Sequence, residues 1–418
     1  MRQPVKSESI REIVEHVVQT TPVLDMHTHL YSRRFGGLLL WGIDELLTYH
    51  YLIAEVLRVA PMAPDRFWAM GQPAQADYVW KHLFLERSPI SEACRGALTV
   101  LHALGLDVGP RDLGAIRRHF AGLDVDAYLD TVFELSGVHS VVMTNDPFDP
   151  TERAIWLAGE ETDPRFQAAL RIDPLLNDWA QMPPRLREMG CAVSGDLGAA
   201  DLAAVRRLLD EWIERIEPRY LAVSLPPTFA FPDPGPRGRL LKQCVLPAAR
   251  EANIPFAMMI GVTRGVNPGH RLAADGVGKA DITVLHRLCA AYPDNRFLVT
   301  LLSRENQHEL CVTARKFPNL LIFGCWWFLN NPSLIDEMTR QRLELLGLSV
   351  MPQHSDARVL DQLIYKWRHS RAVLARVLAD KYVDLAATGW QPTDAEIRRD
   401  VGDLLGGVFE RFCGRSIA

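Results

Sequence analysis

The chain has 418 residues, of which 48% are hydrophobic and 23% are charged. This balance is typical of globular proteins and excludes an intrinsically disordered or fibrous chain. Forty-six Lys and Arg residues against 51 Asp and Glu residues leave a net charge of −5. Because no long run of like charges occurs, we expect neither a nucleic acid nor a membrane as a partner.

The amino-terminal residues 1–18 mix charged and apolar side chains. This mixture predicts a helix and not a signal peptide, and no apolar stretch reaches the roughly 18 residues of a membrane span. We therefore expect a cytoplasmic protein. The seven cysteines are widely spread and form no CxxC pair, which indicates reduced thiols in the core. The oligomeric state is left open, a homo-oligomer included.

Short apolar runs alternate with longer helical patterns from about residue 138 onward. The runs are nearly continuous in apolar residues, as in parallel strands that are covered on both faces, and their spacing leaves room for a helical crossover each time. An eight-stranded α/β barrel, the (β/α)8 or TIM barrel, is the economical interpretation. We predict strands at 23–25, 138–144, 166–172, 220–225, 254–260, 296–302, 320–326 and 348–352.

Residues 31–137 interrupt this alternation, because helical patterns follow one another there without a clear strand. We expect a helical insertion between the first and second strands. The stretch 357–412 predicts two further helices, the second of which begins at Pro392-Thr393-Asp394. We treat residues 1–418 as a single barrel domain that carries both additions.

The reacting groups of such a barrel stand at the carboxyl ends of its strands. The first strand is followed by DMHTH, in which His27 and His29 share a side of an extended chain and can converge on one cation. The eighth strand ends in QHSDAR, which supplies Asp356 as an anionic third ligand. Because strands one and eight are neighbours in a closed barrel, these three residues predict a catalytic metal site. Asp356 could instead cap the helix that follows.

The third strand ends in RIDP, where Arg171 and Asp173 point the same way if the chain is extended. Arg171 then suits a substrate carboxylate or a developing oxyanion, although a structural ion pair with Asp173 is the alternative. In the insertion, the spacing of His50, Tyr51 and Arg58 places all three near one face of a helix. A solvated polar face is the alternative there.

Two further segments belong near the predicted barrel mouth. The seventh strand runs into Trp326 and Trp327, which could form a substrate platform or belong to the core. The fifth strand is followed by Arg264 and a Gly-containing loop with His270, long enough to act as a lid. A second metal ion would need further ligands, but strand four ends without a Lys or Glu that could bridge two cations, and no His directly ends strand five or six. One metal ion is therefore favoured over two.

Taken together, these motifs resemble the uronate isomerase (glucuronate isomerase) family of the amidohydrolase superfamily. Two departures from that family are present: Met259 stands where the family usually has a histidine, and the chain is shorter than the usual member. The matching motifs are DMHTH at 25–29, HYxxxxxxR at 50–58, RIDP at 171–174, IGVTR at 260–264 with DGVGKAD downstream, FGCWWF at 323–328 and SDAR at 355–358.

The resemblance implies an aldose-ketose isomerase of carbohydrate metabolism that interconverts D-glucuronate with D-fructuronate, or D-galacturonate with D-tagaturonate. It also implies a single divalent metal ion, with zinc preferred over manganese, iron and nickel. The implied metal ligands are His27, His29 and Asp356. The implied substrate shell consists of Arg171, Arg358, His50, Tyr51 and Trp326 or Trp327, and we add Arg58 and Arg264 as candidate substrate-binding residues.

Isomerisation of an open-chain uronate needs a base at C2, donors that stabilise the enediolate and an acid at C1. Arg58 or Arg358 can clamp the substrate carboxylate, whereas Arg171 and His50 can hold the oxygens on which charge develops. Asp356 and Tyr51 are the candidates for the base. Two other functions stay open: a mononuclear metal-dependent hydrolase, and a catalytically silent protein that binds a sugar acid, for which Met259 is the motive.

Overall fold

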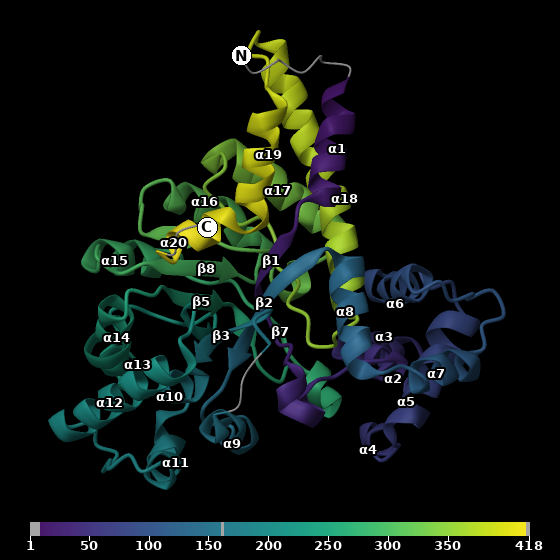
Figure 1. The fold of residues 1–418 in the computed structure, drawn as a ribbon. Coiled ribbons are helices and arrows are strands. Elements are labelled where there is room, and N and C mark those ends of the chain that lie inside the picture. Colours follow the sequence, from purple (N-terminus) through teal and green to yellow (C-terminus); the bar gives the residue numbers. More distant parts are fainter. Residues whose placement is uncertain (1–8, 160–162, 415–418) are drawn as a thin grey trace.

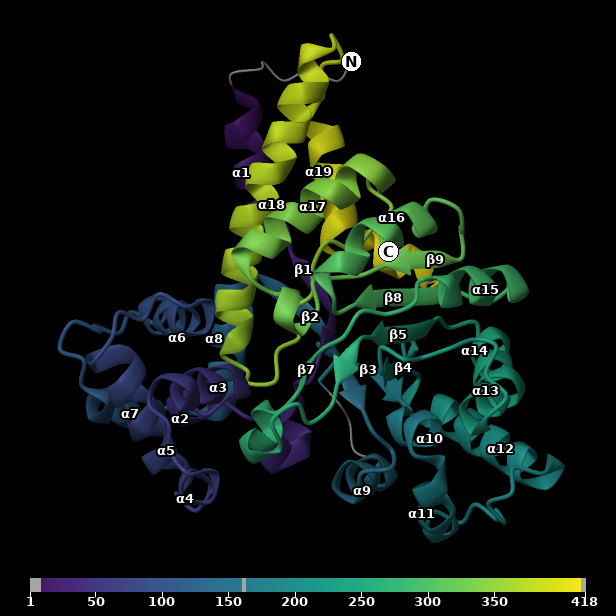
Figure 2. The ribbon, with the colours of Figure 1, turned by 180° about the vertical axis from the view of Figure 1, so that it is seen from behind.

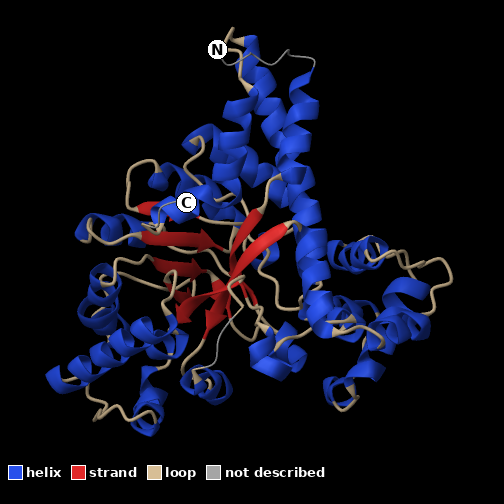
Figure 3. Cartoon of the chain, viewed as in Figure 1, coloured by secondary structure: helices blue, strands red, loops and turns tan. Residues whose placement is uncertain are grey.

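The computed structural model describes residues 9–159 and 163–414. Its centre is a curled sheet of seven parallel strands in the order β1-β2-β3-β4-β5-β8-β9, with helices packed around it (Figure 1, Figure 3). Every strand of this sheet is almost completely buried, as expected for apolar runs covered on both faces. The strands are β1 Val23–Thr28, β2 Val138–Asn145, β3 Phe166–Arg171, β4 Leu221–Leu225, β5 Phe256–Ile260, β8 Phe297–Leu301 and β9 Leu320–Ile322.

The first seven predicted strands are therefore confirmed, with shifted ends. β1 is longer than predicted and includes His27, because its pairing with β2 continues to Thr28. β9 is shorter than predicted and stops before Gly324, whose φ of +62° is not that of a strand. The eighth predicted strand at 348–352 is wrong as a full strand, since it forms only an isolated bridge between Met351 and Phe323.

The segment after that bridge nevertheless runs beside β1. The Met351 N–H donates to the Ile322 carbonyl over 3.0 Å, so the segment starts against β9. Further on, the Asp356 N–H donates to the carbonyl of His27 over 3.2 Å, and the His29 N–H donates to the carbonyl of Ala357 over 2.7 Å. These bonds bring the DMHTH and SDAR motifs to one place.

Helices fill the stretch between β1 and β2, and among its described residues no strand of the central sheet occurs. Most of these helices gather on one side of the sheet (Figure 1). Thr48 and Tyr49 separate the first two of these helices, because Tyr49 has an extended backbone. The helices are α2 Ile43–Leu47, α3 His50–Val59, α4 Pro64–Trp68, α5 Gln72–Val79, α6 Glu92–Ala103, α7 Leu113–Ala121 and α8 Val125–Ser136.

The first of the two predicted carboxyl-terminal helices is confirmed, whereas the second is divided into α19 (Asp394–Gly402) and α20 (Val408–Phe412), because the backbone is not helical at Gly406. α18 (Gln362–Ala387) packs along α1 (Ile10–Thr20), and with α19 (Asp394–Gly402) they extend away from the sheet (Figure 2). α19 begins where predicted, because the Thr393 hydroxyl accepts from the N–H of Glu396 and Glu396 reaches back to the N–H of Thr393. Of the predicted amino-terminal helix, residues 1–8 lie outside the described residues.

The remaining helices follow the strands as crossovers or line the loops. A small antiparallel ribbon, β6 (Val262–Thr263) with β7 (Gly276–Val277), lies in the predicted lid loop. All seven cysteines are free and buried, as predicted for core residues. No helix among the described residues has the length and apolar character needed to cross a bilayer. The other helices include α9 Pro150–Ala158, α10 Asp173–Asn177, α11 Met182–Glu188, α12 Ala199–Ile216, α13 Pro236–Leu240, α14 Leu246–Glu251, α15 Thr283–Ala291, α16 Gln307–Ala314, α17 Pro332–Leu346 and α20 Val408–Phe412.

Candidate active site

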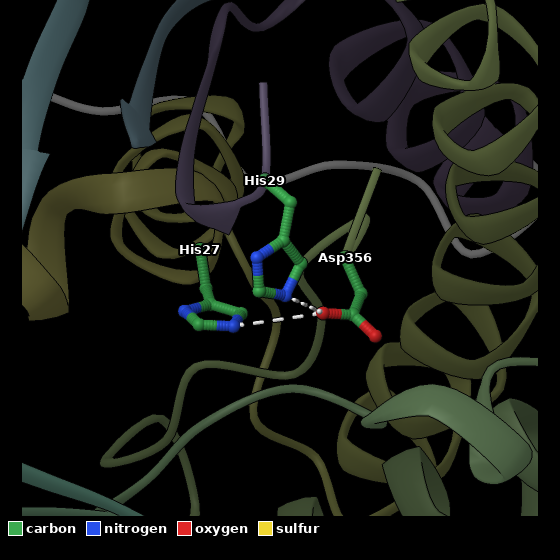
Figure 4. Close-up of side chains that lie close together, drawn as sticks. All are labelled: His27, His29 and Asp356. Carbon is green, nitrogen blue, oxygen red and sulfur yellow. Dashed lines mark ion pairs between the residues drawn. The ribbon is translucent and has the colours of Figure 1, made fainter. Parts of the chain in front are cut away.

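His27 of β1, His29 directly after that strand and the carboxylate near the far end of the chain meet at one point (Figure 4). Asp356 Oδ1 lies 3.5 Å from Nε2 of His27 and 3.5 Å from Nε2 of His29. The side chain of His27 is fully buried, whereas His29 faces a cavity with 23% of its side chain exposed. The alternative of Asp356 as a helix cap is not adopted, because α18 starts at Gln362, six residues later.

Each imidazole faces Asp356 with Nε2, and a hydroxyl group of another residue contacts its Nδ1 and orients the ring. The Tyr220 hydroxyl donates to the Met26 carbonyl over 2.7 Å and lies 3.1 Å from His27 Nδ1. The Thr144 hydroxyl donates to the Thr28 carbonyl over 3.1 Å and lies 2.7 Å from His29 Nδ1. Since each hydroxyl proton is already used, each Nδ1 is the donor, and each Nε2 presents a lone pair toward Asp356.

These three groups fit a divalent cation. Within the described part of the chain, His27 Nε2 and Asp356 Oδ1 are buried without a hydrogen-bond partner. Two lone pairs facing a carboxylate would repel it without a positive charge between them. Metal-ligand bonds of about 2.0–2.2 Å at tetrahedral angles hold ligand atoms about 3.3–3.6 Å apart, which matches the 3.5 Å separations. Burial lowers the pKa of both histidines to about 3, so they are neutral ligands at pH 7.

Backbone geometry distinguishes two residues at this site. Asp356 and Trp327 have φ values of +56° and +48°, in the left-handed region that residues other than glycine rarely adopt. Such conformations cost about 1–3 kcal/mol each and persist where the surrounding structure holds them. The fold therefore retains two unfavourable backbone conformations at the candidate site, one of them in the carboxylate ligand.

His354 is a neighbour of this site that the sequence analysis missed. It is fully buried, its ring lies 5.1 Å from that of His27 between centroids, and neither of its ring nitrogens has a hydrogen-bond partner. The ring occupies the space that a side chain on Gly324 would need, since a Cβ there would lie 1.7 Å from His354 Cδ2. The motif QHSDAR contained His354, but nothing in its spacing separated it from a core residue.

Replacement of Gly324 by Ala should therefore destabilise the protein and disturb His27 through His354. Gly347 is a matched control, because it has a similar φ of +60° but a Cβ added there would have no atom within 4 Å. We expect Gly347→Ala to cost about 1–3 kcal/mol of unfolding free energy from backbone strain alone. Gly324→Ala should cost about 1–3 kcal/mol more, because the core around His354 must shift. Equal losses in chemical denaturation would show that the close contact with His354 has no energetic weight.

A cavity of about 370 Å³ opens beside the three candidate ligands, a size suited to a small metabolite. Its walls come from α2 and α3, from the ends of β3 to β5, from the lid loop and from the segments after β9 and before α18. It is lined by His29, Leu40, Glu45, Thr48, Tyr49, His50, Arg171, Ser224, Met259, Arg264, Leu272, Asp275, Trp326, Trp327, Asp356 and Arg358.

The three arginines of the cavity differ in their partners. Arg171 forms a bidentate pair with Asp173, with both N···O distances 3.0 Å, so the predicted cavity residue is also half of the alternative ion pair. Arg264 pairs with Asp275 of the lid loop. Arg358 is exposed at the cavity and has no carboxylate partner among the described residues. It is therefore the arginine best able to receive a substrate carboxylate.

His50 and the two tryptophans line the cavity as predicted. The Trp327 indole N–H donates to His50 Nε2 over 3.0 Å. Since an indole nitrogen can only donate, His50 accepts on Nε2 and carries its proton on Nδ1. Burial lowers the pKa of His50 to about 3, which agrees with a neutral ring. Trp326 is 3% exposed, lines the cavity and packs in a cluster of buried apolar side chains, so it belongs to the core and its role as a substrate platform stays a prediction.

Tyr51 and Arg58 are placed differently from their neighbour His50. Tyr51 does not line the cavity, and its ring lies 4.2 Å from the His50 ring and 5.3 Å from Lys366 Nζ. Arg58 is exposed and also outside the cavity wall. The periodicity predicted one shared face, but Tyr51 does not share the cavity with His50, and eight residues at a rise of 1.5 Å put Arg58 about 12 Å farther along α3.

The lid loop contributes Arg264, a candidate from the sequence, and two residues that were not expected. His270 does not line the cavity, whereas Leu272 and Asp275 of the same loop do. Glu45, Thr48 and Tyr49 were also missed. Asp275 begins the motif DGVGKAD, and Tyr49 directly precedes the His50-Tyr51 pair. Their nearness to these motifs could have indicated that both residues lie at the site. Glu45 carried no such signal, because a Glu on a helix is ordinarily solvated.

Met259 lies at the floor of the cavity and is 2% exposed. The register of β4 with β5 pairs Met259 with Ser224, which also lines the cavity. Met259 can hold neither a proton nor a hard cation well. Its position is thus an apolar part of the wall beside the polar groups of the site.

Comparisons with known proteins agree with this geometry. No family model matches the sequence, and no curated protein matches it. Among solved structures, a uronate isomerase from Bacillus halodurans C-125 is 55% identical, with a TM-score of 0.97 over 99% of this chain and 98% of that chain.

Two more distant structures share the fold. A uronate isomerase from Thermotoga maritima has a TM-score of 0.77 at 14% identity, over 98% of each chain. A glucuronate isomerase from Caulobacter crescentus has a TM-score of 0.77 at 16% identity, over 98% of this chain and 94% of that chain. The match at 55% identity over nearly the full length places the sequence within one family. The chain belongs to the uronate isomerase family.

Proposed function

We propose that the protein is a metal-dependent aldose-ketose isomerase that interconverts a hexuronate of the D-glucuronate or D-galacturonate type with its 2-keto isomer. The observation that carries this proposal is the 55% identity to a uronate isomerase over nearly the whole of both chains. The cavity supports it, since two candidate metal ligands, His29 and Asp356, line the same space as Arg358, which has no carboxylate partner among the described residues.

His27, His29 and Asp356 would hold one divalent metal ion, with zinc preferred and manganese, iron or nickel as alternatives. When bound, such an ion acts as a Lewis acid toward the oxygens at C1 and C2 of the sugar. The tautomers of both histidines support this role, because Tyr220 and Thr144 hold each Nδ1 as the donor.

The side chains of the cavity would divide the remaining work. Arg358 binds the substrate carboxylate, and Arg171, oriented by Asp173, donates to an oxygen on which charge develops. The sugar would lie against the side chains of Trp326 and Trp327 and the neutral ring of His50. Arg264 contributes less to charge recognition because Asp275 already neutralises it. Arg58 has no part in this proposal, since it lies outside the cavity.

Asp356 is the better of the two candidates for the C2 base. Its second oxygen points away from both histidines (Figure 4) and belongs to a residue of the cavity wall. Tyr51 is unsuited to be a base, because burial raises the pKa of its phenol well above the ordinary value. The proton leaves C2 for the base and is delivered at C1, while the hydroxyl proton moves from O2 to O1, so the aldose becomes the 2-ketose.

The fold that we propose for this activity is a complete (β/α)8 barrel in a single domain. The segment 350–357 would serve as the eighth strand, because it bonds to β9 at Met351 and to β1 at Asp356 and Ala357. Residues 31–137 would then be a helical insertion that supplies part of the cavity wall. We place the enzyme in the cytoplasm with a small acidic sugar as its partner, and the number of subunits stays open.

Deuterium exchange tests the proposed reaction. The purified, metal-loaded protein is incubated with D-glucuronate in deuterium oxide, and NMR follows the carbon positions. We expect deuterium at C2 of the recovered aldose and at C1 of the ketose, because the abstracted proton exchanges with solvent before it returns. The same assay on other uronates and aldonates identifies the preferred sugar.

Other outcomes point to the remaining functions. Metal-loaded protein that binds the sugar but yields neither exchange nor ketose would be a silent sugar-acid binder. Release of an acid or amine from an ester or amide substrate, without ketose formation, would identify a mononuclear hydrolase. Either result would contradict the isomerase proposal for the sugars tested.

A further inference from the structure

Asp25 is a buried carboxylate behind the candidate metal site. It is two residues before His27 on β1 and is 0% exposed. Its Oδ2 accepts the indole N–H of Trp367 over 2.8 Å, and its Oδ1 accepts the backbone N–H of Ser355 over 3.1 Å. Asp25 thus joins β1, α18 and the segment that carries Asp356.

The bond to Ser355 is made directly before the strained residue of the site. Asp356 follows Ser355 and has the left-handed φ of +56°. The Ser355 hydroxyl accepts the Ala357 N–H over 3.1 Å. Asp25 therefore holds the residue before Asp356, and Ser355 in turn holds the residue after it. A left-handed backbone is unfavourable unless its neighbours fix it, and here a carboxylate fixes the nearest N–H.

A second buried group holds the same segment from its carbonyl side. The amide of Asn330 donates to the carbonyls of His354 and Ser355 over 3.2 and 3.0 Å. The amide would satisfy those carbonyls whatever the orientation of Asp356. Among these contacts, the bonds to the Asp25 carboxylate are charge-assisted, and such bonds are roughly twice as strong as neutral ones.

We propose that Asp25 is a positioning residue for the metal site: together with Trp367 it fixes the Ser355 backbone so that the Asp356 carboxylate faces His27 and His29. Asp25 does not lie on the cavity wall, so its effect is indirect. This inference rests on the metal site of the proposed function. It differs from a role in stability alone, because it requires that metal affinity respond when Asp25 changes.

The test compares two buried carboxylates. Asp25→Asn keeps the shape of the side chain but turns an N–H donor toward either Trp367 or Ser355, which are themselves donors. Asp201→Asn is the matched control, because Asp201 is 2% exposed and accepts the N–H groups of Ser194, Gly195 and Leu197 on the edge of the molecule formed by α12. Zinc affinity is measured on each metal-free protein by competition with a chelator, and stability by thermal unfolding.

We expect Asp25→Asn to lower zinc affinity about 10- to 100-fold, as loss of outer-shell partners of metal ligands does. Asp201→Asn should lower the unfolding temperature and leave zinc affinity unchanged. Cobalt bound to Asp25→Asn should also show an altered visible absorption spectrum, because that spectrum depends on ligand geometry. Wild-type zinc affinity in a folded Asp25→Asn protein would overturn the proposal.

If Asp25→Asn does not fold, Trp367→Phe decides the question. This substitution removes one donor to Asp25 and leaves the carboxylate and its bond to Ser355 in place. A several-fold loss of zinc affinity supports the proposal, and no loss overturns it. Wild-type protein that binds no zinc at all would instead remove the metal site itself, which separates a failure of the proposed function from a failure of this inference.

Discussion

Replacement of Asp356 by Asn should abolish turnover and strip the protein of most of its metal. The substitution leaves one neutral oxygen where two neutral imidazoles now meet a carboxylate at 3.5 Å, so the site loses its only negative ligand. Loss of an outer-shell partner already lowers metal affinity about 10- to 100-fold, and loss of a ligand should exceed that. Metal content by elemental analysis and ketose formation are the two measurements.

The substitution also removes the proposed base, so the two measurements separate the two roles. Turnover that returns when excess metal is supplied would leave Asp356 as a ligand and exclude it as the base. A variant that stays inactive while fully loaded would support the base assignment. A fully active, metal-replete Asp356→Asn protein would contradict both roles.

Replacement of Arg358 by Met should reduce kcat/KM about 30- to 200-fold, mainly through KM. Arg358 is the cavity arginine without a carboxylate partner in the described part of the chain, so a substrate carboxylate would lose its charge-assisted bonds. A loss of about 2–3 kcal/mol is the size expected for a truncated partner of such a pair. Initial rates over a range of uronate concentrations measure the effect.

Arg264→Met is the matched control for this prediction. Arg264 lines the same cavity, but Asp275 neutralises its charge and 61% of its side chain is exposed. We expect its removal to change kcat/KM by no more than a few-fold. A larger loss for Arg264→Met than for Arg358→Met would mean that the lid loop, and not the segment before α18, receives the carboxylate.

Several features could be predicted from the sequence because they depend on neighbouring residues. The spacing of His27 and His29 on an extended chain required both rings to face one side, and the structure keeps them there. Thr393 and Glu396 form the predicted start of α19 because a capping box uses residues only three apart. The apolar runs gave seven strands, since burial on both faces demands such runs.

Other features required the tertiary structure, because they depend on where distant segments meet. Arg358 and Arg264 look alike in the sequence, and only the folded structure shows that α3, the lid loop and the segment before α18 bring both of them to one cavity. The direction of each imidazole depends on Tyr220, directly before β4, and on Thr144 of β2, both of which are far from the histidines in the sequence.

Distance along an element was the second limit. Periodicity reports the angle around a helix and not the position along its axis, which is why Arg58 was grouped with His50 although α3 carries it out of the cavity. The sequence by itself thus determined seven of the eight predicted strands and singled out the three residues that meet as candidate metal ligands. The tertiary structure decided which residues border the cavity and which charges remain unpaired there, because α3, the lid loop and the segment before α18 approach one another only in the folded chain.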